Sequence, residues 1–381
     1  MKLTVDSRAL AAELAWAVKF LPARPAVPVL AGVRLDATDG LLRVTVFDYD
    51  TCARAEVPAD IEEEGAVLAP GRVLAAAAGH LPDGPALLEA EGPALGLSCG
   101  SARFRLLTLP LEDYPHTPAV PEPLGEIDGD ALAEAVAGTH VACSTDLTLP
   151  MFTGVLLTAE GTRVRLQATD RYRLAEQALD WTPTRPGAAA RVLVPGRVLA
   201  TAARAMTGAP VRIGLAEDHG TPSAVTLAGA GRSLTATLLD TKDYPDLNRF
   251  FTTAAEGEAV IAPTQRLLEA VRRAATIAYR HTPVALTITA DRIDVECGVD
   301  DTQSGDTVSA VAQSETRVAF NPAYLADALS HIPGGTVRLL VPPGGSGLVL
   351  LTADEDDPAY RHIVVPVRTA DAGRQTERSA A

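Results

Sequence analysis

Three stretches of the chain place apolar residues at helical spacing. In residues 6–22, one face of a helix would carry Leu10, Leu14, Ala17, Val18 and Leu21. Residues 128–143 repeat the pattern with Leu132, Val136 and Thr139, and residues 263–279 repeat it with Leu267, Val271, Ala274, Ala275 and Ala278. Asp6 or Ser7 precedes the first stripe, and both are favourable N-cap residues. The pattern predicts three amphipathic helices, spread along the whole chain.

Runs that alternate apolar and polar residues follow each predicted helix. Turn signals interrupt these runs at Asp39-Gly40, at Glu160-Gly161 and near Ala290-Asp291. An Asp-Gly pair between two alternating runs is a strong signal for a β-hairpin, because both turn positions favour a positive φ angle. We therefore expect antiparallel strands after each helix.

One short phrase is repeated along the chain. The sequence PGRVLA occupies residues 70–75 and again 195–200, and a related sequence, NPAYLA, occupies 321–326. Each follows an apolar run and continues into a helical pattern. Proline suits the first turn of a helix, because its missing N–H has no intrahelical partner there. We expect each phrase to begin a second helix, with its proline in the first turn.

These repeats indicate three similar units in the 381 residues. Proline-rich residues 114–126 mark the first joint, and a less distinctive joint lies at 248–260. We expect an α+β fold of three tandem domains, at 1–122, 123–252 and 253–368. The polar, aperiodic residues 369–381 are expected to form a disordered tail.

Composition narrows the functional classes. The formal net charge of −15 argues against a wholly basic nucleic-acid binder, although basic residues can still gather on one face. No apolar run is long enough for a membrane span, and the N-terminus lacks the apolar core of a signal peptide. The four cysteines are scattered, which is typical of free thiols in a cytoplasmic protein. We expect a cytoplasmic protein without membrane contact.

Several ordered sequence blocks together resemble a known family. They include FRLLTLPLEDYP at 104–115, GVLLTAEGTRVRLQATDRYRLA at 154–175, VAFNPAYLADAL at 318–329 and YRHIVVPVR at 360–368. In this order and spacing, the chain resembles the bacterial DNA polymerase III beta subunit, the replicative sliding clamp. The segment ATDRYRLA looks closest to the actinobacterial form.

The resemblance implies a fold and a function. The family forms a head-to-tail homodimer, in which six domains make a ring around duplex DNA, with helices lining the hole and antiparallel sheets outside. Such a ring gives the polymerase processivity and catalyses no reaction itself, so neither a cofactor nor a metal is expected. The implied partners are double-stranded DNA, bound without sequence preference, and the polymerase III alpha subunit, the clamp loader and repair proteins, bound through short linear peptides.

Arginines on the predicted helices are the candidate DNA contacts. Lysine occurs three times in the chain, so guanidinium groups would make most phosphate contacts. Arg24 and Arg72 match DNA-contacting positions of the family, and the helices add Arg197, Arg204, Arg266, Arg272 and Arg273. Each of these arginines also fits a solvated helix face. In the loop 144–151, Asp146 and Pro150-Met151 depart from the family pattern.

The family binds partner peptides in a groove whose positions are matched late in the chain. The matching residues are Phe152, Thr169, Arg171, Tyr172, Arg173, Leu174, Pro245, Arg249, Phe250, Ile363, Val364, Val365, Pro366, Val367 and Arg368. An apolar groove with a few polar groups suits an extended peptide. The alternative is that IVVPV is an ordinary buried strand at a sheet edge, the location that Pro366 favours.

Departures from the family pattern leave a second function open. Val365 stands where methionine is common, Gly345 and Gly347 stand where larger residues are common, and Thr369 replaces leucine. One alternative is a paralogous clamp that gives self-resistance to a clamp-binding antibiotic. Another is an adaptor with the clamp fold that binds partners without encircling DNA. An enzyme is disfavoured, because the histidines and glycines form no metal-binding or phosphate-loop motif.

The resemblance also marks two positions of the ring interface. Phe104, on a predicted edge strand of the first domain, and Ile277, on a helix of the third, match interface positions of the family. Either residue fits a domain core equally well.

Overall fold

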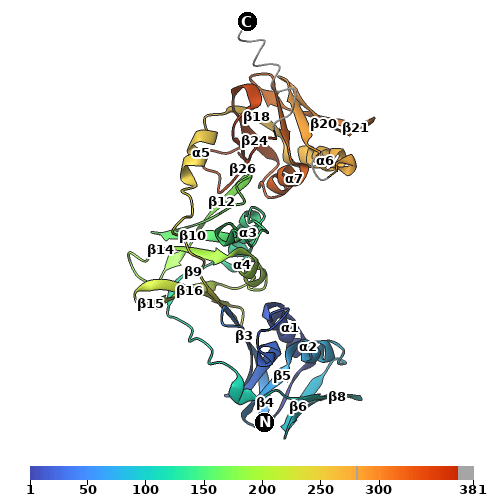
Figure 1. Ribbon diagram of the computed structural model, residues 1–381, viewed down its shortest axis with the longest axis vertical. Helices are drawn as coiled ribbons and strands as arrows, with labels where there is room; N and C mark the ends of the chain where they lie inside the picture. The colour runs from blue at the N-terminus through green and yellow to red at the C-terminus, as the bar shows by residue number, and fades with distance from the viewer. Residues whose placement is uncertain (280–281, 300, 368–381) are drawn as a thin grey trace. The chain divides into compact units, whose positions relative to one another are not determined.

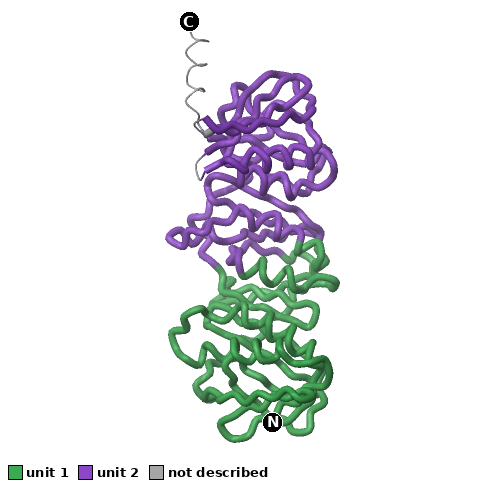
Figure 2. The backbone as a smooth tube through the Cα atoms, turned by 90° about the vertical axis from the view of Figure 1, so that its right-hand side faces the viewer, with its two compact units in different colours: residues 1–133, 181–188, 198–238 green, residues 134–180, 189–197, 239–381 purple. Residues whose placement is uncertain are grey.

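The computed structural model describes residues 1–279, 282–299 and 301–367. The predicted tail at 369–381 and Arg368 lie outside these residues. The chain divides into two compact units, shown in green and purple in Figure 2. Unit 1 contains 1–133, 181–188 and 198–238, and unit 2 contains the remaining described residues.

Unit 1 is built on one large antiparallel sheet. Its main path runs β13-β9-β15-β16-β17-β4-β1-β6-β7-β8, and β2, β3 and β5 branch from β4 through β3. The strands are β1 (Lys2–Asp6), β2 (Gly32–Thr38), β3 (Leu41–Phe47), β4 (Thr51–Glu63), β5 (Gly65–Pro70), β6 (Pro85–Glu91), β7 (Ala94–Cys99), β8 (Ala102–Leu107), β9 (Pro123–Ile127), β13 (Thr182–Pro183), β15 (Val211–Asp218), β16 (Thr221–Gly229) and β17 (Arg232–Thr237).

Unit 2 contains two antiparallel sheets. The larger runs β14-β10-β11-β12-β26-β25-β24-β18-β22, and the smaller runs β21-β20-β19-β23. Their strands are β10 (Gly154–Glu160), β11 (Arg163–Thr169), β12 (Arg173–Asp180), β14 (Ala190–Pro195), β18 (Glu258–Pro263), β19 (Val284–Ile288), β20 (Arg292–Val299), β21 (Thr302–Ser309), β22 (Val311–Ala312), β23 (Thr316–Phe320), β24 (Thr336–Val341), β25 (Val349–Ala353) and β26 (Tyr360–Val364).

Helices form at the three predicted stripes and at the three repeated phrases, and α5 (Asn248–Ala254) lies in the expected second joint. The helices are α1 (Ser7–Ala17), α2 (Gly71–Gly79), α3 (Gly129–His140), α4 (Gly196–Ala203), α5, α6 (Thr264–Ala274) and α7 (Pro322–Ser330). Leu10 and Leu14 are fully buried, as are Leu132, Thr139 and Leu267. Helix α1 packs beside α2 in unit 1, and α6 packs beside α7 in unit 2 (Figure 1). The apolar pattern therefore predicted the buried faces of these helices correctly.

Local signals explain where α1 begins and how the first hairpin turns. The Asp6 carboxylate accepts a hydrogen bond of 2.9 Å from the Ala9 backbone N–H, so Asp6 is the N-cap. Asp39 and Gly40 have φ angles of 53° and 73°, as the predicted hairpin turn requires. The α+β fold with antiparallel sheets is confirmed by the strand pairings.

At each repeated phrase a strand ends and a helix begins, as expected, but two of the three prolines lie just before the first turn of the helix. Pro70 ends β5 and pairs with Gly32, and Pro195 likewise ends β14, so both stand before the helix. A glycine begins each helix because the space is tight: a Cβ atom on Gly71 would lie 2.6 Å from the Leu21 side chain. Pro322 does lie in the first turn of α7, which Asn321 caps.

Residues 248–260, the expected second joint, carry regular structure. Their first half forms α5, which buries Phe251 and Ala254 against unit 2. The four cysteines are free, as predicted, and Cys52, Cys99 and Cys297 are buried. None of the helices in the described part of the chain has the length and apolar character that crossing a bilayer requires.

Candidate functional site

An apolar groove of about 180 Å³ opens on unit 2. Two strands, the turn between β11 and β12, helix α5 and two loops contribute to it. Its lining residues are Phe152, Thr169, Arg171, Arg173, Leu174, Pro245, Leu247, Phe250, Leu348, Ile363 and Val365. We call this site the apolar groove.

The turn from Thr169 to Arg173 shapes one rim of the apolar groove. The Thr169 hydroxyl donates to the Arg173 carbonyl oxygen at 2.8 Å and accepts from the Arg171 backbone N–H at 3.0 Å. The Asp170 carboxylate accepts from the backbone N–H groups of Tyr172 and Arg173. Arg171 has a φ angle of 78°, a strained conformation for a side chain with a Cβ atom. These hydrogen bonds hold the turn in that conformation.

The two arginines of this turn have different surroundings. Arg171 lies over the Phe152 ring, with its guanidinium carbon 5.7 Å from the ring centroid. Arg173 instead forms ion pairs with Asp170 at 3.0 Å and with Asp327 at 2.6 Å, and it lies over the Tyr324 ring. The charge of Arg173 is therefore balanced, and its contacts with Asp327 and Tyr324 join β12 to α7. Arg171 instead places a cation at the rim of the groove.

The floor of the apolar groove comes from β12 and β26. Leu174 faces Ile363 across the two strands, and both are buried in one apolar cluster with Leu247. Beyond the end of β26, the Val365 backbone N–H donates to the Tyr172 carbonyl oxygen at 2.9 Å. Since successive side chains alternate between the faces of a strand, Val364 points away from the groove that Ile363 and Val365 line.

The structure brings together most, but not all, of the predicted groove residues. Those that line the groove are Phe152, Thr169, Arg171, Arg173, Leu174, Pro245, Phe250, Ile363 and Val365. Those placed beside it are Tyr172, which is exposed, Arg249, which lies over the Phe250 ring, and Val364, Pro366 and Val367. Arg368 lies outside the described residues.

The edge location that Pro366 suggested is wrong. Strand β26 is an interior strand, because it pairs with β12 on one side and β25 on the other. The strand ends at Val364, so Pro366 removes no ladder hydrogen bond. After it, the Val367 backbone N–H donates to the Ala319 carbonyl oxygen at 2.7 Å.

Sequence reasoning missed Leu247 and Leu348. Leu247 follows Pro245, which the resemblance did include, and its apolar side chain in a polar loop was a usable signal. Leu348 closes the loop in which Gly345 and Gly347 drew attention, yet neither glycine lines the groove. A Cβ atom on Gly345 would lie 2.4 Å from the Arg317 carbonyl oxygen, so the loop packs against β23 at that point.

The predicted DNA contacts all lie on the surface. Arg24 stands in the loop before η2 (Pro28–Ala31), and the others are on or just after helices: Arg72 on α2, Arg197 and Arg204 at α4, and Arg266, Arg272 and Arg273 on α6. Arg72 also donates to the Leu21 carbonyl oxygen at 3.0 Å. Arg273 pairs with Asp306 and lies 3.7 Å from Glu269, and the pairing lowers the Asp306 pKa.

The two predicted interface residues are both partly exposed. Phe104 lies on β8, the last strand of the unit 1 sheet, so one side of its backbone has no strand partner in the described residues. Leu107 on the same strand is 73% exposed. Ile277 ends η5 (Ala275–Ile277), directly after α6.

Comparison with known proteins gives matches along almost the whole chain. Three models of the DNA polymerase III beta subunit match in order: the N-terminal domain at 1–118, the central domain at 126–246 and the C-terminal domain at 253–368. The "Beta sliding clamp" of Streptomyces coelicolor is 40% identical over 97% of this chain and 99% of its own length. That relative agrees with the expected actinobacterial type.

Two further relatives are a second Streptomyces protein and a clamp that has been solved with a bound ligand. The "Beta sliding clamp homolog GriR" of Streptomyces muensis is 32% identical over 97% of this chain and 99% of its own length. The crystal structure of the sliding clamp of Pseudomonas aeruginosa bound to griselimycin superposes with a TM-score of 0.87. It is 25% identical and covers 97% of this chain and all of that one.

Proposed function

Because this chain belongs to the DNA polymerase III beta subunit family, we propose that it encircles duplex DNA as a homodimeric ring and tethers the replicative polymerase. The order of the three family segments over nearly the whole chain carries this proposal. The chain is a DNA sliding clamp of the family fold. It works in the cytoplasm by binding rather than by catalysis, and its domains are 1–122, 123–252 and 253–368.

The apolar groove supports the tethering role. Its lining combines apolar side chains with the Arg171 cation and with backbone groups of a fixed turn. Such a site suits a short extended peptide with apolar anchors. We assign to it the linear peptides of the polymerase alpha subunit, the clamp loader and repair proteins.

The exposed arginines support the DNA role. Arg24, Arg72, Arg197, Arg204, Arg266 and Arg272 present guanidinium groups from helices or from the loop before η2. Contacts of this kind bind phosphate without reading sequence, as a ring that slides must do. Arg273 is the weakest of the set, because Asp306 and Glu269 already balance its charge.

A processivity assay tests the proposal. The purified chain is loaded by a clamp loader onto a primed circular template, and product length is measured with the polymerase. We expect long products with the unaltered chain and a loss of at least tenfold in length with Val365→Asp, which puts a charge in the groove. Val311→Asp, on the exposed strand β22, is the matched control and should leave product length unchanged.

Two outcomes of this assay contradict the proposal. Short products with the unaltered chain, together with retained peptide binding, would indicate an adaptor that does not encircle DNA. Equal loss in both variants would show that the groove does not hold the polymerase.

A divergent clamp that resists a clamp-binding antibiotic is the second candidate. Two observations favour it: the compact Val365 lines the groove, and the loop at Gly345 packs too tightly against Arg317 for a larger side chain. Griselimycin is the appropriate ligand, because the Pseudomonas aeruginosa clamp has been solved with it. We expect this chain to bind griselimycin at least tenfold more weakly than that clamp in calorimetry. Equal affinity would refute self-resistance.

A further inference from the structure

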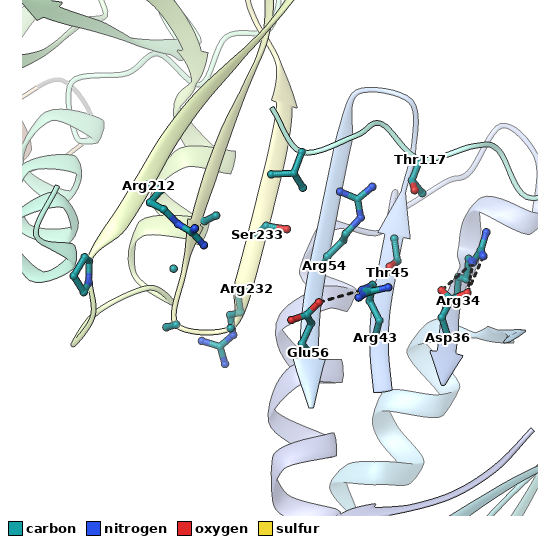
Figure 3. Close-up of a pocket in the computed structure, with 16 residues that line it drawn as sticks. Arg34, Asp36, Arg43, Thr45, Arg54, Glu56, Thr117, Arg212, Arg232 and Ser233 are labelled. Carbon is teal, nitrogen blue, oxygen red and sulfur yellow. Dashed lines mark hydrogen bonds and ion pairs between the residues drawn. The ribbon is translucent and has the colours of Figure 1, made fainter. Parts of the chain in front are cut away.

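A second, polar groove of about 700 Å³ lies on the sheet of unit 1 (Figure 3). We call it the arginine groove, because five arginines line it: Arg34, Arg43, Arg54, Arg212 and Arg232. The proposed replication function uses none of these residues. Thr117 and Val120, from the segment between β8 and β9, also line it.

The strand register places three of the arginines in one row. Arg34 faces Thr45, Thr45 faces Arg54, and Arg54 faces Ser233. The row continues from Ser233 to Ala228 and ends at Arg212. Directly opposed residues share one face of a sheet, so this row crosses six strands on a single face. Neighbouring strands are about 4.8 Å apart, so about 14 Å separates the row positions of Arg54 and Arg212.

Carboxylates balance three of the five arginines. Arg34 pairs with Asp36 at 2.7 Å, Arg43 pairs with Glu56 at 3.1 Å, and the Glu13 carboxylate of α1 accepts two hydrogen bonds of 2.7 Å from Arg232. These pairs contribute no net charge to the groove.

No carboxylate of the described residues forms an ion pair with either of the remaining two arginines. Arg54 donates to the Pro118 carbonyl oxygen, a neutral group, and so holds the segment after β8 against the sheet. Arg212 is exposed, and its side chain forms no hydrogen bond or ion pair within the described part of the chain, not even with Glu126, which pairs with it across the strands. Figure 3 shows Arg212 and Arg54 on separate strands, with Ser233 between them.

The lining shows which anion fits. Among the described residues, no aromatic side chain lines the arginine groove, so these residues offer no surface on which bases could stack, as single-stranded nucleic acids require. Because carboxylates already balance three of the five arginines, the groove also offers no continuous row of cations to a phosphate backbone. Isolated carboxylates avoid both difficulties, since each can pair with one guanidinium group in the fork geometry. Thr45, Thr117 and Ser233 add hydroxyl groups for a peptide backbone.

We propose that the arginine groove binds an acidic segment of a partner protein in an extended conformation. Its two carboxylates lie about four residues apart, because an extended chain rises about 3.3 Å per residue and Arg54 and Arg212 are about 14 Å apart along the row. Val120 and Pro210, at the wall, receive an apolar residue between the two acids. This site is separate in sequence from the apolar groove and does not depend on the replication function.

Fluorescence anisotropy with the full chain tests the proposal. The probe is a labelled nine-residue peptide of alanine and serine, with valine at its centre and glutamates at its third and seventh positions. We expect salt-sensitive binding that Arg212→Glu weakens at least tenfold. Arg185→Glu, an equal charge change on an exposed arginine of unit 1 outside the groove, should change affinity less than twofold. A peptide with adjacent glutamates should bind more weakly than the spaced one.

The same experiment can overturn the proposal. Equal weakening by Arg212→Glu and Arg185→Glu would indicate a general charge effect rather than a site. Oligothymidylate that binds more tightly than the peptide, with the binding lost in Arg212→Glu, would identify a nucleic-acid site instead. Absence of peptide binding to the unaltered chain would refute the proposal outright. Thermal unfolding midpoints of both variants check that each one is folded.

Discussion

At the scale of single residues, His362 shows how burial fixes a protonation state. The side chain is completely buried in unit 2, and its Nδ1 lies 2.7 Å from the Tyr360 hydroxyl oxygen, which lies 3.2 Å from the Gly138 carbonyl oxygen. Burial is the main cause that lowers the His362 pKa to about 3, and the nearby positive charges of Arg173 and His331 add to it. His362 is therefore neutral at physiological pH.

This shift predicts acid sensitivity. The unfolded chain binds a proton at His362 near the ordinary pKa of about 6.5, whereas the folded chain does not until about pH 3. Stability should thus fall as the pH decreases from about 6.5 towards 3. Urea unfolding at pH 7 and pH 5 should show this loss in the unaltered chain and a smaller loss in His362→Gln.

The exposed His80 provides the control for that experiment. His80→Gln should retain the full acid sensitivity, because it leaves the buried His362 and its surroundings unchanged. If His362→Gln and His80→Gln lose stability equally between pH 7 and pH 5, the buried histidine is not the cause.

At the scale of elements, sequence patterns predicted what is local. The stripe through Leu10 and Leu14 and the turn at Asp39-Gly40 are encoded within a few neighbouring residues, and both appear in the structure. Pro70 marked the end of β5 and the start of α2 to within one residue, but it is the N-cap rather than a first-turn residue, because it still pairs with Gly32 of β2. Local periodicity cannot report such a long-range pairing.

The lining of the apolar groove likewise contains residues that the sequence predicted and residues that it did not. The resemblance found the residues of β12 and β26, since these belong to recognisable motifs. Leu247 and Leu348 lie in loops without periodicity, and the tertiary fold alone brings them to the groove. The arginine row of unit 1 was also invisible in the sequence, because Arg54 and Arg212 are joined only through the register of β4, β17, β16 and β15.

The cap of α1 leads to a prediction at this scale. Asp6→Ala removes the hydrogen bond to the Ala9 N–H and should destabilise α1 by about 1 kcal/mol. Hydrogen exchange of the α1 amides should then be about fivefold faster. Asp6→Asn, which keeps an accepting oxygen, should exchange at nearly the original rate. Unchanged exchange in Asp6→Ala would mean that packing of Leu10 and Leu14 alone holds the helix start.

At the scale of the whole molecule, the open edges of the sheets are the places where another chain could pair. Strand β8 ends the unit 1 sheet, and β21 ends the smaller sheet of unit 2. An open strand edge with exposed apolar residues such as Leu107 invites another chain. The proposed homodimer would cover such edges.

A carboxylate introduced by substitution at the proposed interface should dissociate the dimer. Phe104→Glu or Ile277→Glu should reduce the mass measured by light scattering from twice 39.7 kDa to 39.7 kDa, because an unpaired carboxylate would be buried. Val27→Glu, at another exposed apolar position, should remain dimeric. A dimer that persists in both interface variants would place Phe104 and Ile277 outside the interface.

The antiparallel pairing of β17 with β4 also limits which segments can be exchanged between relatives without loss of folding. It joins residues 232–236 of the central family segment to residues 51–55 of the first, with Thr235 opposite Cys52. A fragment that stopped at residue 118 would expose the edge of β4 and its buried side chains, and free edges of this kind aggregate. Exchange of the first segment between relatives should therefore give a folded protein only where the donor preserves this register.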